Sequence, residues 1–295
     1  MRLLTAIAMS LLAGLAAAED RQAGPVGLPA GPMREQLHWV PYPAPPAAQT
    51  ALMLMRVCRP AGDRPAKLAV INHGSPPDSA RRPLMQPTAC VHEVTRWFLD
   101  RGFVVAYPMR RGYGQNAGGI FDGRGPCENP GYDRAGLATA NDVQAAIAYA
   151  QALPFVRREA TLVIGQSVGG WGSIALASRN PANVAALVNF AGGHGGHYNN
   201  QPGNNCNPEA LIASAGLYGK KARRPMLWIY TANDSFFGPS LAKAMHEAFA
   251  AGGGVARLEQ LAPFDQDGHG LLFGNGGSRI WGPIVERYLA EHNIR

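Results

Sequence analysis

The segment at residues 161–172, written TLVIGQSVGGWG, constrains this chain more than any other. It begins with a short apolar, β-branched run, which predicts a buried strand, and a helix-compatible segment begins at Gly170. Between them lies GQSVG, with Ser167 at its centre. Glycine two positions before and after the serine fits a strand-to-helix turn without room for side chains. The alternative is an ordinary glycine-rich turn that happens to contain a serine.

Short apolar strands and helices alternate through the rest of the chain. Strands are expected at 51–59, 67–72, 103–107, 160–164, 184–190, 225–230 and 255–261, and helices at 87–101, 138–153, 170–178, 208–218, 239–251 and 282–292. Continuous apolar strands alternating with helices predict an α/β fold, a mostly parallel twisted sheet with helices on both faces. A chain of 295 residues fits one such domain.

The N-terminus has the features of a secretory signal peptide at residues 1–18. Arg2 precedes an apolar run that is too short for a transmembrane span, and Ala16-Ala17-Ala18 offers a cleavage site. No cysteine is present there for a lipid anchor, and no later stretch approaches the length of a membrane span. We therefore expect an exported protein, periplasmic or secreted. Residues 19–48 are rich in proline and glycine and predict an extended N-terminal arm on the core, with a possible strand at 36–40, before a single domain at 49–295.

The chain is basic, with 27 Lys and Arg residues against 20 Asp and Glu and a net charge of +7. The basic residues are scattered, often as pairs such as Arg81-Arg82 and Arg157-Arg158, and form no long run. Nucleic-acid binders gather such charge on one helix or stripe with interleaved aromatic residues. The pattern argues against nucleic acid as a partner and indicates a solvated surface with mild attraction to anions.

Four cysteines are present, Cys58, Cys90, Cys127 and Cys206. An even number in an exported protein favours disulfides, whereas wide spacing without a C-x-x-C pair argues against a zinc site. Three pairings are possible, and four free thiols are the alternative.

Three residues with complementary chemistry lie after predicted strands. Ligands of parallel sheets bind at this position, beyond the carboxyl ends of the strands. Ser167, Asp234 and His269 occur in the order nucleophile, acid and histidine. A serine hydroxyl needs an imidazole to accept its proton, and the imidazole needs a carboxylate that fixes its tautomer and balances its charge. Asp265 and Asp267 are alternatives for the acid, but they share the loop of His269 and follow no strand of their own.

An oxyanion formed at Ser167 would need two backbone N–H donors. The N–H of Val168 directly follows the serine, and the N–H of Ser75 lies in the loop after the strand at 67–72. His73, in the same loop, is expected to have a structural role.

Together these segments resemble a known superfamily. They are HGS at 73–75, RGYG at 111–114, GQSVGG at 165–170, Asp234 and DGHG at 267–270. From residue 51 to its end the chain resembles α/β-hydrolases close to the dienelactone hydrolase and prolyl oligopeptidase-like branch. The resemblance implies one α/β-hydrolase catalytic domain. Dienelactone hydrolases proper carry a cysteine nucleophile where this chain has Ser167, and the peptidases carry a large N-terminal propeller, so dienelactone turnover and size-filtered oligopeptide cleavage are both disfavoured.

In such a fold the loops at 110–132 and 191–207 select the substrate. The fold favours the pairs Cys58–Cys90 and Cys127–Cys206, and the second pair would tie the two loops together as a lid. Candidate pocket residues are Gly74, Tyr113, Gln166, Trp171 and His194, although Trp171 fits core packing equally well.

His194 and His197 form an H-x-x-H pair, which can bind a metal. Without nearby carboxylates or thiolates they fit polar lining of a pocket better. We therefore expect no metal and no cofactor.

The sequence thus predicts an exported serine hydrolase that cleaves a small-molecule or polymeric carboxylic ester through an acyl-enzyme on Ser167. A small serine peptidase and a non-catalytic binding protein of the same fold are the alternatives. The oligomeric state is left open.

Overall fold

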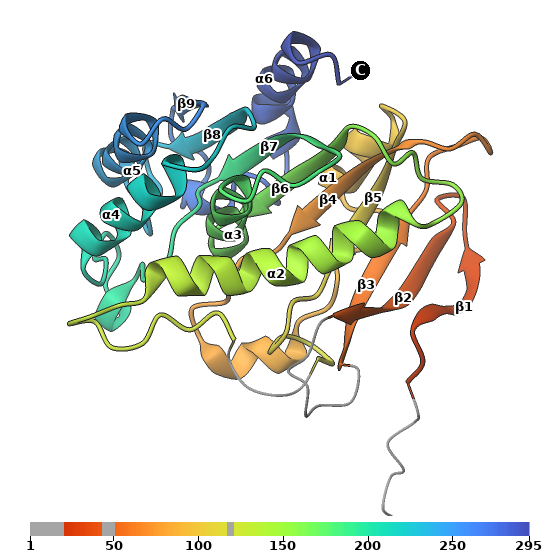
Figure 1. The fold of residues 1–295 in the computed structure, drawn as a ribbon, viewed down its shortest axis with the longest axis horizontal. Helices are drawn as coiled ribbons and strands as arrows, with labels where there is room; N and C mark the ends of the chain where they lie inside the picture. Colours follow the sequence, from red (N-terminus) through yellow and green to blue (C-terminus); the bar gives the residue numbers. More distant parts are fainter. Residues whose placement is uncertain (1–20, 43–50, 117–120, 295) are drawn as a thin grey trace, which may run out of the picture.

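A nine-stranded sheet organises the part of the chain that our computed structural model describes, which is residues 21–42, 51–116 and 121–294 (Figure 1). Its strands are β1 (Gly24–Ala30), β2 (Glu35–Tyr42), β3 (Ala51–Cys58), β4 (Lys67–Asn72), β5 (Phe103–Pro108), β6 (Thr161–Gln166), β7 (Val184–Phe190), β8 (Met226–Thr231) and β9 (Ala256–Leu261). Their order is β1-β2-β3-β5-β4-β6-β7-β8-β9. β1, β2 and β3 pair antiparallel and β3 joins β5 in the same way, whereas β5, β4, β6, β7, β8 and β9 run parallel.

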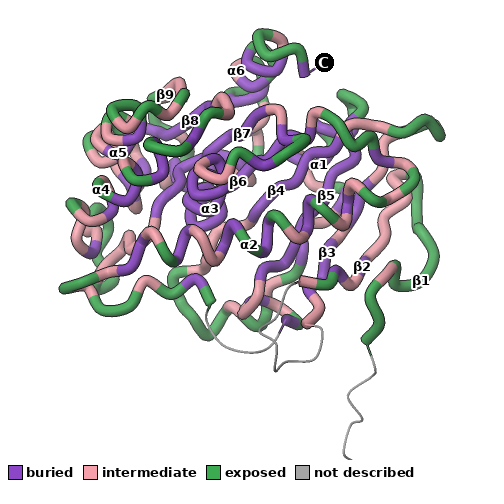
Figure 2. Tube along the Cα trace, in the orientation of Figure 1, coloured by how far each residue is buried: buried purple, intermediate pink, exposed green. Residues whose placement is uncertain are grey.

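Helices cover both faces of this sheet, so the predicted fold class is confirmed (Figure 1). They are α1 (Glu93–Leu99), α2 (Tyr132–Gln151), α3 (Val168–Ala177), α4 (Pro208–Gly219), α5 (Pro239–Ala251) and α6 (Gly277–Glu291), with short 3₁₀ helices η1 (Ser79–Leu84), η2 (Tyr198–Asn200) and η3 (Gly268–Gly270). Alternate residues of a strand serve opposite faces: Leu68 and Val70 of β4 pack with α2 and α3, whereas Ala69 and Ile71 pack with α1 and α6. The parallel strands are therefore buried on both sides, except for the edge strand β9, whose residues remain partly exposed (Figure 2).

The predicted elements differ from the observed ones mainly at the N-terminal side. Residues 24–42 form two strands at the sheet edge, where the sequence predicts an extended arm with one strand at 36–40. Helix α1 begins at Glu93 and not at residue 87, because the His92 side chain caps it and Cys90 is held in a disulfide. Helix α2 begins six residues earlier than the expected 138. The predicted signal peptide at 1–18 lies outside the described residues.

Both disulfides that the fold favours are present. Cys58–Cys90 joins the end of β3 to the segment before α1, and Cys127–Cys206 joins the loop after β5 to the loop after β7. Disulfides persist in oxidising compartments, so the pairs are compatible with export. No described helix is both long and apolar enough to cross a membrane.

Candidate active site

Ser167 occupies a strained turn between β6 and α3. Its φ of 56° and ψ of −123° are unusual for a residue with a side chain. A Cβ atom on Gly165 would lie 2.2 Å from the carbonyl oxygen of Gly169, and one on Gly169 would lie 2.5 Å from that of His73. Only glycine fits at these positions, so the tight turn predicted from the motif is confirmed.

The structure brings His269 and Asp234 together. His269 lies in η3 and Asp234 follows β8, and the distance from His269 Nδ1 to Asp234 Oδ1 is 3.0 Å. The same carboxylate oxygen accepts hydrogen bonds from the backbone N–H groups of Phe236 and Phe237, at 2.8 and 2.9 Å. Because a carboxylate accepts and cannot donate, Nδ1 carries the proton and Nε2 is the basic nitrogen.

The two alternative acids make other contacts. Asp267 accepts from the backbone N–H of His269 at 3.0 Å and from the Ser235 hydroxyl at 2.5 Å, and it does not bind the imidazole. Burial alone would raise the pKa of the Asp267 carboxyl, but these hydrogen bonds bring that pKa below its usual value. Asp265 contributes only its backbone carbonyl, as an acceptor for Asn233.

A second set of contacts holds the histidine loop beside the serine turn. Gln166, the residue before Ser167, donates from Nε2 to the carbonyl oxygen of His269 at 3.0 Å. The Phe236 ring stacks on the imidazole of His269, with centroids 4.1 Å apart, and on that of His197 at 3.6 Å. His197 also approaches the Ser235 hydroxyl at 2.7 Å, which links the loop after β7 to Asp267. No sequence pattern predicts this stack, because three separate loops supply its rings.

The two expected oxyanion donors lie close to Ser167. Val168 is the first residue of α3, where the helix dipole favours negative charge. A Cβ on Gly74 would lie 3.0 Å from the Ser167 Cβ, so the loop that carries Ser75 approaches the serine closely. Among the described residues, no backbone hydrogen bond outside helices and strands uses the N–H of Ser75 or Val168. His73 has the expected structural role, since it contacts the Gly74 carbonyl at 2.6 Å and accepts from the Arg110 N–H at 3.2 Å.

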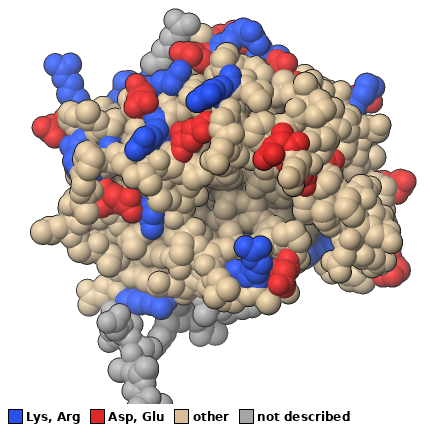
Figure 3. All heavy atoms as spheres, turned by 180° about the vertical axis from the view of Figure 1, so that it is seen from behind, with Lys and Arg blue, Asp and Glu red and all other residues tan. Residues whose placement is uncertain are grey.

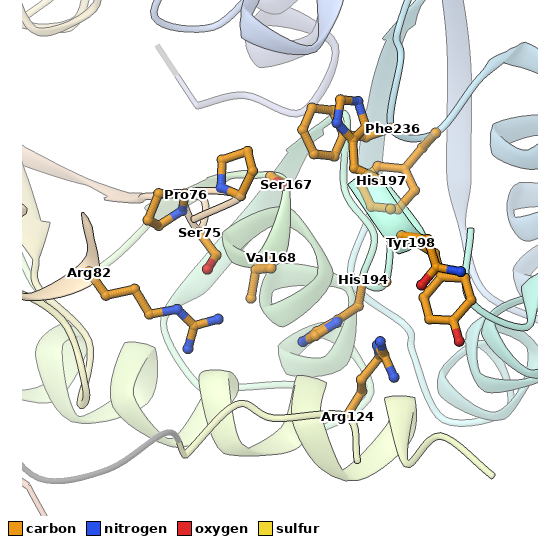
Figure 4. A pocket seen from close by; sticks show the side chains of 15 residues that line it. Ser75, Pro76, Arg82, Arg124, Ser167, Val168, His194, His197, Tyr198 and Phe236 are labelled. Carbon is orange, nitrogen blue, oxygen red and sulfur yellow. The ribbon is translucent and has the colours of Figure 1, made fainter. Parts of the chain in front are cut away.

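A cavity of about 400 Å³ opens in front of Ser167 (Figure 4). Arg82 and Arg124 point into it from two sides, with His194 between them. Arg82 lies 3.7 Å from Asp122, whereas Arg124 has no carboxylate partner within the described chain. The further lining residues are Ser75, Pro76, Pro77, Val168, Gly195, Gly196, His197, Tyr198, Asn199, Phe236 and Phe237. The cavity therefore offers positive charge opposite the nucleophilic position.

Only one of the five predicted pocket residues lines this cavity. His194 does so, and its Nε2 lies 2.8 Å from the Asp122 carbonyl, while burial lowers its pKa. Trp171 lies in the core, where its Nε1 donates to the Tyr132 carbonyl at 2.9 Å and its ring packs against α2, so the prediction of a pocket role for Trp171 is wrong. Tyr113 is buried against His73, with its hydroxyl on Asp122 at 2.8 Å.

Gly74 and Gln166 line a neighbouring hollow of about 550 Å³, which the Ser75-Pro76-Pro77 segment separates from the main cavity. The sequence did not single out Arg82 or Arg124. Arg124 lies in a loop expected to select substrate, but a sequence cannot say which way a loop side chain points. No group of three or more possible metal ligands occurs in the described part of the chain.

The match to a family model decides the relationship of the chain to known proteins. The model of the dienelactone hydrolase family matches residues 87–273, which is more than half of the chain. The chain belongs to the dienelactone hydrolase family. This membership confirms the resemblance seen in the motifs and makes the protein a hydrolase. No curated protein sequence matches the chain.

Solved structures similar to this family member share its α/β-hydrolase fold. An acetyl xylan esterase from Paenibacillus sp. R4 is 14% identical with a TM-score of 0.62, and the match covers 92% of this chain and 88% of that one. An esterase from Pyrococcus furiosus is 14% identical, with a TM-score of 0.58 and coverage of 88% and 93%. An acylaminoacyl peptidase from Pyrococcus horikoshii is 13% identical with a TM-score of 0.61; the match covers 87% of this chain and only 41% of the peptidase. At such identities the likeness concerns the fold alone.

Proposed function

We propose that the protein is an exported serine hydrolase that cleaves carboxylic esters through an acyl-enzyme on Ser167. The observation that carries the proposal is the 3.0 Å contact between His269 Nδ1 and Asp234, beside a serine held in a strained turn. Export is supported by the predicted signal peptide and by the two disulfides.

In this mechanism the Ser167 hydroxyl attacks the ester carbonyl while His269 Nε2 accepts its proton. Asp234 holds the tautomer and balances the charge of the imidazolium. The N–H groups of Val168 and Ser75 donate to the oxyanion of the tetrahedral intermediate. His269 then returns the proton to the leaving alcohol, and a water activated in the same way releases the acid.

Labelling with a fluorophosphonate tests the nucleophile directly. We expect the reagent to add one phosphonyl group to Ser167 of the wild type, located by peptide mass spectrometry. The Ser167→Ala variant should remain unlabelled, whereas Ser75→Ala, which keeps its backbone N–H, should still react. A wild-type protein that resists the reagent would favour a non-catalytic binding protein of the same fold.

The same mechanism can cleave amides, as in a small peptidase. Matched p-nitrophenyl esters and p-nitroanilides with equal acyl groups separate the two activities. The proposal requires a larger kcat/KM for the ester at each acyl length.

Arg124 gives the cavity a preference for negatively charged esters. The Arg124→Gln substitution should lower kcat/KM for a p-nitrophenyl ester with a carboxylate on its acyl group by about tenfold or more, because a charge-assisted hydrogen bond is lost. Turnover of the uncharged acetyl ester should change little. The Lys221→Gln variant, with an exposed cation on another surface, is the control; equal losses on both esters would contradict this role of Arg124.

A further inference from the structure

A groove crosses the edge of the sheet opposite to Ser167. Two adjacent hollows, of about 650 and 510 Å³, lie side by side and share Pro60, Ala61 and Gly102 in their linings. The turn from β3 to β4, the end of α1 and the segment before β6 form its walls, at the amino ends of β4 and β5 (Figure 1, upper right). We call this surface the basic groove.

Cationic side chains dominate the lining of the basic groove. Within the described residues, five of them form neither a salt bridge nor a side-chain hydrogen bond: Arg59, Arg64, Lys67, Arg96 and Arg157. Only Asp63 and Asp100 oppose them, and Asp63 is already paired with Arg34 at 2.9 Å. A sixth cation, Arg101, is paired with Glu286 at 3.1 Å. The groove therefore keeps an excess of uncompensated positive charge.

Burial and repulsion between neighbouring cations disfavour the charged forms of Lys67 and Arg59. The Nζ atom of Lys67 is buried without a hydrogen-bond partner among the described residues. Burial, and after it the charge of Arg157, lowers the pKa of Lys67. Burial and the neighbouring Arg34 likewise lower the pKa of Arg59, whose guanidinium lies 4.0 Å from the centroid of the Phe155 ring. A bound anion would offset the repulsion between these cations.

The shape and the lining of the groove select among polyanions. A membrane surface needs a convex or flat face with protruding apolar residues, and this surface is concave. Single-stranded nucleic acid needs aromatic rings on which bases stack, and no aromatic side chain lines the groove. Sequence-specific readout of duplex DNA needs a helix or ribbon inserted into the major groove, whereas turns and the end of one helix form these walls. Guanidinium groups suit carboxylates and sulfates, because they bind both in bidentate fashion.

We propose that the basic groove binds an acidic polysaccharide, whose repeated carboxylate or sulfate groups contact Arg59, Arg64, Arg96 and Arg157, while the buried charge of Lys67 adds to the positive field beneath them. On the face seen in Figure 3, Lys and Arg side chains toward the upper left are interspersed with Asp and Glu side chains. The site lies away from Ser167 and is independent of the ester chemistry. Binding there would hold the hydrolase on an anionic matrix.

The test compares two variants with the same loss of charge. The groove variant carries Arg64→Gln, Arg96→Gln and Arg157→Gln, all at exposed positions. The control variant carries Arg134→Gln, Lys220→Gln and Lys221→Gln, exposed positions that do not line the groove. Titration calorimetry at about 50 mM salt, where charges are weakly screened, measures binding to heparin oligosaccharides, to oligogalacturonate, to neutral dextran and to duplex DNA.

We expect the wild type to bind at least one acidic oligosaccharide and not dextran. The groove variant should bind about tenfold more weakly or worse, and the control variant should bind nearly as the wild type does. The heparin and oligogalacturonate arms distinguish sulfate from carboxylate as the recognised group. Without ligand, the groove variant should unfold at the same or a higher temperature than the wild type, because repulsion is relieved.

Three results would overturn the proposal. The first is a wild type that binds neither acidic oligosaccharide, and the second is an equal loss of affinity in both variants, which would reflect net charge alone. The third is duplex DNA that binds as tightly as the oligosaccharides and depends on the same three residues. Hydrolysis of a p-nitrophenyl ester should be equal in all three proteins, which verifies their folding.

Discussion

Replacing Ser167 with alanine should lower kcat for a short-chain p-nitrophenyl ester by about 10⁴-fold or more, because alanine has no hydroxyl group that could form the acyl-enzyme. The fold should be unaffected, since the turn depends on Gly165 and Gly169, where a Cβ would meet backbone atoms, and not on the hydroxyl. The measurement is steady-state turnover of highly purified protein. Thermal unfolding of the same variant checks that its structure is intact.

The matched control for this variant is Ser75→Ala. Its backbone N–H remains in place, so any oxyanion contact is kept and kcat should stay within about tenfold of the wild type. If Ser167→Ala retained wild-type turnover while its unfolding temperature was unchanged, the nucleophile would have to be sought elsewhere.

Removing the carboxylate of Asp234 should lower kcat about as much as replacing Ser167 does. With Asp234→Ala, His269 Nδ1 loses its acceptor, the tautomer is no longer fixed, and kcat should fall by about 10⁴-fold. The Asp234→Asn variant should fall between this and the wild type. Its amide oxygen can still accept from Nδ1 and from the N–H groups of Phe236 and Phe237, but it cannot balance the charge of the imidazolium.

The neighbouring Asp267 provides the decisive comparison. It accepts from the backbone N–H of His269 and from Ser235 and does not contact the imidazole, so Asp267→Asn, which keeps an acceptor oxygen, should change kcat by less than about tenfold. Steady-state kinetics of these variants on one ester tests the assignment. If Asp267→Asn were the more damaging substitution, Asp267 and not Asp234 would be the acid.

The sequence predicted those parts of the molecule that local chemistry determines. The parallel strands could be predicted because most of them are continuous apolar runs. Ser167 was a candidate because it directly follows β6, and Asp234 and His269 were candidates because they lie in the loops after β8 and β9. Strand β1 could not be predicted, because its residues are mostly exposed and it is held in place by pairing with β2. Its proline-rich and glycine-rich sequence carries no alternating pattern.

The pocket was harder to predict for a different reason. Trp171 follows the serine within one turn of α3, so its position in the chain fits either a cavity wall or the core, and only packing against α2 and Tyr218 decides. Arg82 reaches the cavity from the short 3₁₀ helix η1, and Arg124 reaches it from the loop after β5. Side-chain direction in such segments depends on long-range contacts, such as that between Arg82 and Asp122, which no local pattern encodes.

The Cys127–Cys206 disulfide fixes the two loops that line the substrate cavity, and these loops are separate from the elements that hold the Ser167 turn. It anchors the loop that carries Arg124 to the loop that carries His194 and His197, whereas the sheet and its buried helices hold the Ser167 turn. The lengths and sequences of the two loops can therefore diverge between relatives while one covalent bond keeps them facing each other. Such a molecule can acquire a new substrate by changes in its loops alone, without any change in the residues around its serine.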